Sequence, residues 1–225
     1  MRQPSPLSRL ISWGLSVFFK MIYHPMAWAY DWVAAIVSVG RWETWVMSAL
    51  PDLPGPRILE LGNGTGHLQI SLAQRRLTAF GLDQSRQMSR ITRRRMHALS
   101  YESLLVTGMA QTLPYRTQSF NQVVSTFPTP YIFERQTLEE IFRVLIPGGT
   151  LIVIPEAWIT GESLSDRIAA GAFRLLGQAP NWEDSILQPF LEAGFTTYIE
   201  RRKLPSSEIL VIRAVKQDVK RSTAI

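Results

Sequence analysis

Apolar residues in this chain gather in short continuous runs, which alternate with longer stretches where they recur every three or four positions. Short runs are typical of buried strands, and the longer spacing is typical of helices with one buried face. The runs predict strands at residues 57–61, 77–82, 103–107, 120–125 and 151–154. The spaced stretches predict a helix beginning near Gly66 and further helices at 85–99 and 134–145.

This alternation predicts a doubly wound α/β fold, with a mostly parallel sheet covered by helices on both faces. Two further runs, 196–201 and 208–215, predict a closing antiparallel pair and bring the sheet to seven strands. In such a sheet a ligand binds beyond the carboxyl ends of the parallel strands.

A glycine-rich turn follows the first predicted strand. Residues 57–68 read RILELGNGTGHL, a strand, a turn that lets the backbone approach a nucleotide, and the start of a helix. The dinucleotide fingerprint G-x-G-x-x-G would need a glycine at position 67, where the chain has His67. That spacing, and the absence of a Tyr-x-x-x-Lys pair, disfavour an NAD-dependent reductase.

The pattern is E-x-G-x-G-x-G instead, and Glu60, Gly62, Gly64 and Gly66 match it position for position. By these residues the chain resembles the class I S-adenosylmethionine-dependent methyltransferases, whose Rossmann-like fold has the predicted sheet. The resemblance implies that the acid and the glycines hold the amino-acid end of the cofactor. The alternative is a glycine turn that only tightens a strand–helix junction.

Later motifs agree with the resemblance. Asp83 ends the second strand about twenty residues beyond Gly62, where an acid can accept hydrogen bonds from ribose hydroxyls. It opens a D-x-S-x-x-M stretch common in the family, and residues 143–149 resemble the family's R-V-L-x-P-G-G. The implied S-adenosylmethionine site comprises Glu60, Gly62, Asn63, Gly64, Gly66, Asp83, Gln84, Met88, Met109, Ala110 and Ser125.

Three positions depart from the family pattern. Met109 replaces the acid that meets the adenine amino group, so apolar contact with Met88 and Met109 is expected to hold the base. Asn121 replaces the acid of F-D-x-V-x-S. The stretch 127–130, FPTP, does not satisfy the N/D-P-P-Y/F motif of enzymes that methylate amino groups of nucleic acids, which disfavours that activity.

The sequence divides into an aromatic-rich helical extension (1–50), a methyltransferase domain (51–215) and a basic tail (216–225). Five of the seven tryptophans lie in the extension, and its apolar runs are too short to span a membrane. Two interpretations stay open: a helical cap over the site, or a tryptophan-rich face at a membrane interface. Residues 27–31, AWAYD, resemble a segment of the ubiquinone/menaquinone-biosynthesis methyltransferases in which Tyr30 would close over the cofactor; Tyr30 as a packing residue is the alternative.

A signal peptide is disfavoured because Lys20 and His24-Pro25 separate the apolar run from the small residues of a cleavage site. We therefore expect a cytoplasmic protein, peripheral at the inner face of the membrane if the interfacial interpretation holds.

The net charge of +6 favours anionic partners, and the arginines of 85–99 form either a patch for RNA or lipid head groups or a solvated helix face. The lack of cysteine excludes disulfides and thiolate chemistry, and three scattered histidines suggest no metal site.

The expected reaction is methyl transfer from a sulfonium by in-line displacement, in which the protein mainly aligns donor and acceptor and excludes water. A base is needed only for an acceptor that holds its proton; His24, Tyr30, Tyr131 and Glu156 are candidates by position. The aromatic extension and the quinone-type resemblance favour a small or lipophilic acceptor. The alternatives are an RNA or protein methyltransferase, with nucleic acid the less favoured partner, and a non-catalytic membrane-associated scaffold. The sequence favours no oligomeric state.

Overall fold

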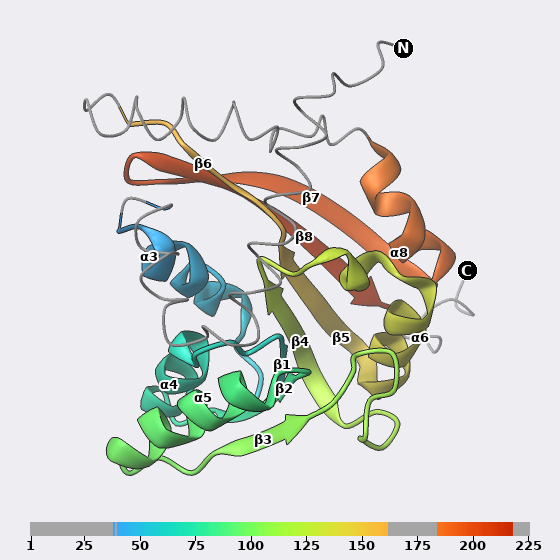
Figure 1. Ribbon diagram of the computed structural model, residues 1–225. Coiled ribbons are helices and arrows are strands. Elements are labelled where there is room, and N and C mark those ends of the chain that lie inside the picture. The colour runs from blue at the N-terminus through green and yellow to red at the C-terminus, as the bar shows by residue number, and fades with distance from the viewer. Residues whose placement is uncertain (1–37, 39, 162–183, 218–225) are drawn as a thin grey trace, which may run out of the picture.

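The computed structural model describes residues 38, 40–161 and 184–217 (Figure 1). They form one mixed sheet in the order β3-β2-β1-β4-β5-β8-β6, with β7 pairing along β8. The strands are β1 (Arg57–Leu61), β2 (Thr78–Asp83), β3 (Leu104–Thr107), β4 (Phe120–Thr126), β5 (Leu145–Ile154), β6 (Ala157–Ile159), β7 (Phe195–Leu204) and β8 (Ser207–Lys216). The helices are α3 (Trp42–Met47), α4 (His67–Gln74), α5 (Arg86–Ala98), α6 (Arg135–Val144) and α8 (Gln188–Glu192), with 3₁₀ turns η2 (Leu50–Asp52), η3 (Pro130–Phe133) and η4 (Asp184–Leu187).

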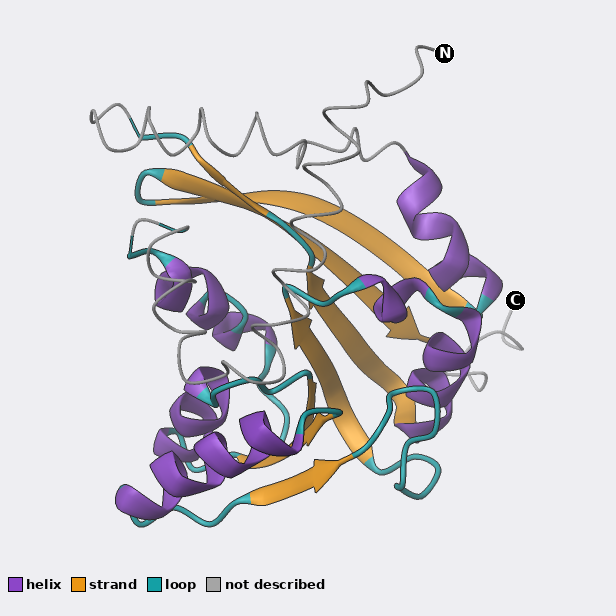
Figure 2. Cartoon of the chain, viewed as in Figure 1, coloured by secondary structure: helices purple, strands orange, loops and turns teal. Residues whose placement is uncertain are grey.

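Residue alternation along the strands divides the core into two layers, one on each face of the sheet (Figure 2). Ile58 and Val124 point to the layer that contains α3 and α4, whereas their neighbours Leu59 and Val123 point to the layer that contains α6 and α8. This two-residue period is what a strand buried on both faces requires. The predicted doubly wound α/β fold is therefore confirmed.

The strand order reverses between β1 and β4, and this reversal positions the site. From β1 the chain proceeds outward through β2 to β3, and then crosses to β4 on the other side of β1. The ladder between β1 and β4 ends at Glu60 paired with Val124, short of the last residues of both strands. Such a switch point leaves a crevice at the carboxyl ends of the strands, where ligands bind in open α/β sheets.

The predicted seven-stranded sheet is confirmed, with one short addition. Strand β6 continues the line of β5 along β8 after an interruption at Pro155 and Glu156, so that Val153 pairs with Ile212 and Ala157 with Ile209. The segment that follows β5 thus begins with a short strand; residues 162–183 lie outside the described part.

The entry into β5 also differs from the prediction. The helix of 134–145 was expected to end at the Pro-Gly-Gly turn, with a strand from 151, yet β5 begins directly after α6 at Leu145. The register shifts between the pairs Phe120–Leu145 and Gln122–Thr150, and Gly148 has φ +75°. The prolyl and glycyl residues therefore form an irregularity inside the strand, a bulge-like role that glycine permits.

The described end of the extension packs into the core. Trp45 on α3 is 2% exposed, and its indole Nε1–H donates a hydrogen bond of 2.9 Å to Ser207 Oγ at the start of β8. Asp52, in the predicted linker, accepts hydrogen bonds from Arg202 (2.7 Å) and Arg213 on the β7–β8 pair. Helix α3 therefore packs against the sheet. The cap and membrane interpretations concern helices expected within residues 8–39, and residues 1–37, with His24 and Tyr30, lie outside the described part; the domain boundaries stay a prediction.

Within the described residues, no helix is long and apolar enough to cross a membrane.

Candidate functional site

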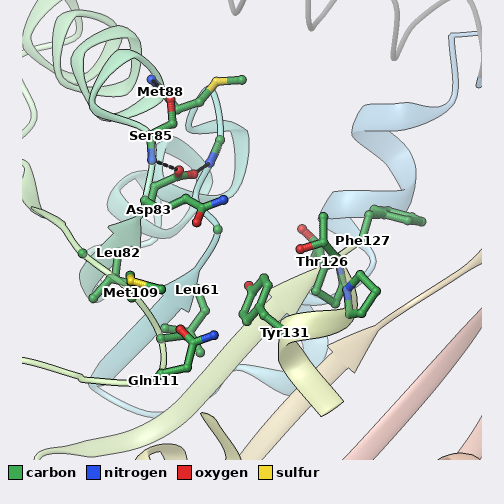
Figure 3. Close-up of a pocket in the computed structure, with 18 of the residues that line it drawn as sticks. Leu61, Leu82, Asp83, Ser85, Met88, Met109, Gln111, Thr126, Phe127 and Tyr131 are labelled. Carbon is green, nitrogen blue, oxygen red and sulfur yellow. Dashed lines mark hydrogen bonds between the residues drawn. The ribbon is translucent and has the colours of Figure 1, made fainter. Parts of the chain in front are cut away.

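A cavity of about 380 Å³ lies where β1, β2 and β4 end, at the switch point (Figure 3). Its volume is in the range of small-ligand sites, roughly 300–1,000 Å³. The lining residues are Leu61, Gly62, Gly64, Leu82, Asp83, Gln84, Ser85, Met88, Gly108, Met109, Ala110, Gln111, Thr126, Phe127, Pro128, Thr129, Pro130, Tyr131 and Glu134. Eight of the predicted site residues are among them: Gly62, Gly64, Asp83, Gln84, Met88, Met109, Ala110 and Tyr131.

The three glycines of the motif have positive φ, but their roles differ. A Cβ on Gly66 would lie 2.4 Å from Thr92 Cγ2, so this glycine allows α4 to pack closely against α5. A Cβ on Gly64 would meet no protein atom within 4 Å, and Gly64 lines the cavity. The space beside Gly64 is therefore room for a ligand, as a nucleotide-binding turn requires.

Asp83 is fixed at the end of β2 by two backbone groups. Its Oδ2 accepts a hydrogen bond from Gly64 N–H at 2.9 Å, and its Oδ1 accepts one from Ser85 N–H at 2.8 Å (Figure 3). Burial raises the pKa of this carboxyl, and the two backbone hydrogen bonds oppose the rise. A carboxylate has about four acceptor positions, so Asp83 can bind ribose hydroxyls while it holds the loop.

A smaller cavity of about 40 Å³ lies on the other side of the glycine loop. It shares Gly62, Gly64 and Thr126 with the larger one and is also lined by Glu60, Asn63, Gly66 and Trp42. The predicted residues for the amino-acid end of the cofactor thus lie around this cavity, while those for the adenosine lie around the larger one. The two spaces meet at Gly62, which suits a cofactor with two such ends.

Glu60 is an uncharged wall of the smaller cavity over most of the neutral pH range. Its side chain is 2% exposed and accepts a hydrogen bond of 2.7 Å from Gln69 Nε2. Burial raises its pKa to about 8, the negative charge of Asp83 raises it further, and the Gln69 hydrogen bond opposes both. The implied role of Glu60 at the amino-acid end is compatible with its position, as a buried polar group behind the loop.

Asn63 organises the loop and does not line the large cavity. Its Nδ2 lies 3.2 Å from both Gly64 O and Thr92 Oγ1, and Thr92 Oγ1 donates to the same carbonyl at 2.7 Å. These contacts connect the glycine turn to α5. The buried Oδ1 of Asn63 has no hydrogen-bond partner among the described residues, so it is an acceptor beside the smaller cavity.

The expected adenine end is apolar. Met88 is 1% exposed beneath the cavity, whereas Met109 is 56% exposed at its edge, and both line it (Figure 3). An exposed thioether next to a cavity provides the soft, adaptable surface that a planar base can contact. Gln111 and Glu134, which the sequence did not indicate, join across the opening by a hydrogen bond of 2.6 Å.

A hydrogen-bonded chain connects β1, β4 and Tyr131. Ser125 is fully buried, and its Oγ–H donates to Leu61 O at 2.8 Å, where the β1–β4 ladder has ended. Ser125 Oγ also lies 3.0 Å from the Tyr131 hydroxyl. Because serine has one proton and gives it to Leu61, Tyr131 is the donor in this second bond. Ser125 does not line the cavity; it positions Tyr131, which does.

The stretch Thr126 to Pro130 is the part of the site that sequence reasoning missed. Residues 127–130 do not match the nucleic-acid motif, yet they and Thr126 all line the cavity. Phe127 has φ +50°, for which the sequence carries no signal. Within the described residues, no group of three or more His, Asp or Glu side chains is arranged to hold a metal ion.

Comparison with known proteins agrees with this site. Residues 58–149 match the family model of a methyltransferase domain. The chain is 31% identical over 136 residues to demethylmenaquinone methyltransferase of Renibacterium salmoninarum, which covers 59% of this chain and 56% of that protein. It is 26% identical over 142 residues to the ubiquinone/menaquinone biosynthesis C-methyltransferase of Geotalea daltonii, covering 59% and 60%. The chain thus spans little more than half the length of these relatives.

Solved structures show the same fold at low identity. A phosphoethanolamine N-methyltransferase 2 of Haemonchus contortus superposes with TM-score 0.63 at 16% identity, covering 86% of this chain and 57% of that one. An S-adenosylmethionine-dependent methyltransferase of Aquifex aeolicus gives TM-score 0.59 at 16% identity, covering 78% and 92%. Residues 58–149 are therefore a methyltransferase domain of the S-adenosylmethionine-dependent type, and S-adenosylmethionine is the cofactor of this domain.

Proposed function

We propose that the protein transfers a methyl group from S-adenosylmethionine to a small lipophilic acceptor, and that the acceptor is a quinol-type ring. The observation that carries this proposal is the continuity of the large cavity. Its cofactor side contains Asp83, Met88 and Met109, and its other side contains Phe127 to Tyr131. A donor and an acceptor bound in one continuous cavity can be aligned with one another.

The acceptor side disfavours an anionic molecule. Pro128, Pro130 and Tyr131 present apolar surface, and the acidic residues of the lining are Asp83, held by backbone N–H groups, and Glu134, which accepts a hydrogen bond from the neutral amide of Gln111. A phosphorylated head group would find no positively charged side chain among the described lining residues of this cavity. The quinone-methylating relatives act on a ring of the kind that such a surface accommodates.

When bound, S-adenosylmethionine would supply an activated methyl group on its sulfonium, which the acceptor would receive in exchange for a proton released to solvent, with S-adenosylhomocysteine as the leaving group. The residues of this chain bind and orient the two reactants. Asp83 would hold the ribose end, Gly62 and Gly64 allow close approach of the backbone, and Tyr131 lines the larger cavity with its hydroxyl beside Gly62, which lines both cavities. Such alignment accounts for roughly 7–11 kcal/mol of a bimolecular barrier.

The alternative acceptors receive less support. Two of the α5 arginines bond within the domain: Arg93 donates to Leu105 O at 3.3 Å and Arg95 to Thr65 O at 3.1 Å. Part of the basic face therefore stabilises the fold, which weakens the RNA interpretation. A non-catalytic scaffold would be expected to lose the glycine loop and the ribose acid, yet Asp83 and Gly64 keep a working geometry.

The test is methyl transfer from isotopically labelled S-adenosylmethionine by the full chain. Three acceptors are compared: reduced demethylmenaquinone in detergent micelles, phosphoethanolamine, and a structured RNA. We expect labelled product from the quinol alone. Labelling of phosphoethanolamine or RNA, with none of the quinol, would contradict the proposed acceptor class.

We further propose that the protein works in the cytoplasm at the inner face of the membrane, because a quinol with a lipid tail resides there. The tryptophans of residues 1–37 would make the contact. Sedimentation with anionic vesicles compares the full chain with a variant in which Trp13, Trp28 and Trp32 are replaced by alanine. Equal binding by both proteins would contradict a tryptophan-mediated membrane contact.

A further inference from the structure

Phe127 has a backbone conformation that a bulky residue rarely adopts. It follows the last residue of β4 with φ +50°, in the left-handed region. Such a conformation is unfavourable in a residue other than glycine and persists where its surroundings hold it. Because Phe127 lines the large cavity, the strain lies at the site.

Helix α3 supplies the contacts that hold Phe127. The ring centroid of Phe127 lies 4.6 Å from that of Trp42 and 6.0 Å from that of Trp45, with tilted planes. Trp45 is itself fixed by its hydrogen bond to Ser207 on β8. The backbone N–H of Phe127 donates to Ile154 O at 2.7 Å. Tilted aromatic pairs of this kind stabilise the folded state beyond their buried area, so they oppose the strain.

The side chains of Phe127 and Tyr131 point in different directions. In Figure 3 the Phe127 ring points toward α3, away from Tyr131, while Tyr131 points back toward Leu61. The left-handed turn therefore lets residue 127 anchor the loop on one side and lets Tyr131 enter the site on the other. Tyr131 Oη lies 3.2 Å from the position of a Cβ on Gly62, the residue that lines both cavities.

We propose that Phe127 is a positioning residue, clamped by Trp42 and Trp45, whose strained turn aims Tyr131 at the junction of the two cavities. Helix α3 acts on the position of Tyr131 through this clamp, and its residue Trp42 also lines the smaller cavity. The kinetic part of this inference rests on the proposed methyl transfer; the structural part does not. The strain is thus a working part of the site, set by an element that precedes the cofactor-binding strands.

The structural part is tested by hydrogen–deuterium exchange in the full chain loaded with S-adenosylhomocysteine. The reporter is the peptide that contains the Phe127 amide, compared in Trp42→Ala, Trp42→Phe and Trp158→Ala. Trp158 is the matched control: a half-buried tryptophan on β6 that contacts the Arg201 guanidinium and lines neither cavity. We expect exchange at least about 10-fold faster in Trp42→Ala, and wild-type rates in the other two.

The kinetic part uses the same variants and Phe127→Gly, which adopts positive φ without strain but has no ring. With labelled cofactor and the reduced quinone, we expect kcat to fall about 10²-fold in Trp42→Ala and Phe127→Gly, with the KM for S-adenosylmethionine unchanged in Phe127→Gly. Trp42→Ala is expected to raise this KM as well, because Trp42 lines the smaller cavity. Trp42→Phe should recover most of the rate. A Phe127→Gly variant with wild-type kcat would overturn the proposal, because the ring would then be dispensable.

The two parts fail separately. If no acceptor is methylated by the wild-type protein, the proposed function fails, and the exchange experiment still decides whether the clamp exists. If Trp42→Ala leaves the exchange of the Phe127 amide unchanged, the clamp is wrong whatever the substrate.

Discussion

The Oδ2 of Asp83 accepts a hydrogen bond from the backbone N–H of Gly64 at 2.9 Å. This bond joins the end of β2 to the glycine turn that follows β1, so the ribose acid and the nucleotide-binding turn are positioned by one another. The second oxygen of the same carboxylate is fixed by Ser85 at the start of α5. A site built in this way is organised before the cofactor arrives, which lowers the ordering cost of binding.

Replacing Asp83 by alanine should weaken S-adenosylhomocysteine binding at least about 10-fold, which corresponds to roughly 1.4 kcal/mol. The reason is the loss of a charged acceptor, whose hydrogen bonds contribute about 1.5–3 kcal/mol each. Calorimetric titration measures the affinity, and thermal unfolding verifies that the variant is folded. Glu102→Ala, an exposed carboxylate beyond α5, is the control. A folded Asp83→Ala protein with wild-type affinity would show that the ribose site lies elsewhere.

Gly64 and Gly148 form a matched pair for testing the turn. Both have positive φ, +49° and +75°, and a Cβ on either would meet no protein atom within 4 Å, but only Gly64 lines the cavities. Alanine at each position should cost about 1–2 kcal/mol of unfolding free energy, since both are left-handed. Calorimetry should find cofactor-product affinity reduced in Gly64→Ala alone. Equal affinity in the two variants would mean that the space beside Gly64 is not the ligand's.

The raised pKa of Glu60 predicts that the free energy of unfolding depends on pH. Its folded-state pKa of about 8 lies above the ordinary value of 4.5, so the folded protein retains a proton that the unfolded chain loses between these values. The contribution of Glu60 to the unfolding free energy is therefore greatest below about pH 4.5 and falls as the pH rises toward about 8. Glu60→Gln should remove this component of the slope.

Urea unfolding of the wild type and Glu60→Gln at about pH 5 and about pH 8 makes the comparison. The difference in unfolding free energy between the variant and the wild type is measured at the lower pH as the reference. At the higher pH this difference should shift in favour of the variant. A difference between the two proteins that does not change with pH would contradict the raised pKa.

Ser125 and Tyr131 should be energetically coupled, because the Tyr131 hydroxyl donates to Ser125 Oγ, which donates to Leu61 O. Ser125→Ala leaves a buried carbonyl unsatisfied and should cost about 1–3 kcal/mol. Adding Tyr131→Phe should then cost less than it does in the wild type, with a coupling of about 0.5–1.5 kcal/mol in a double-mutant cycle. Additive losses of unfolding free energy would show that the two hydroxyls do not form one chain.

Much of the fold follows from the sequence because its determinants are local. The strand from Arg57 to Leu61 and the helix from Arg86 to Ala98 lie within one residue of their predicted bounds, since the apolar period and the flanking turns specify them. Strand β6 could not be found in this way. Its three residues, Ala157–Ile159, are extended because they pair with β8, about fifty residues away.

The site was predictable where backbone chemistry defines it. Gly64 and Asp83 follow from a turn that needs positive φ and an acid at a strand end. The placement of Ser125 behind Tyr131, and of Glu60 at the smaller cavity, depends on which way strand residues face once the sheet has assembled. Phe127 was missed because its left-handed φ is imposed by α3 and opposes its own preference, so no local pattern encodes it.

The assignment of the switch-point cavity to S-adenosylmethionine is tested most directly by calorimetric titration of the full chain with S-adenosylhomocysteine, with NAD in a parallel cell. We predict micromolar binding of S-adenosylhomocysteine at one site per chain and no binding of NAD. Binding of NAD in its place, or no binding of S-adenosylhomocysteine with or without anionic vesicles, would contradict the assignment of the cavity at the switch point to this cofactor.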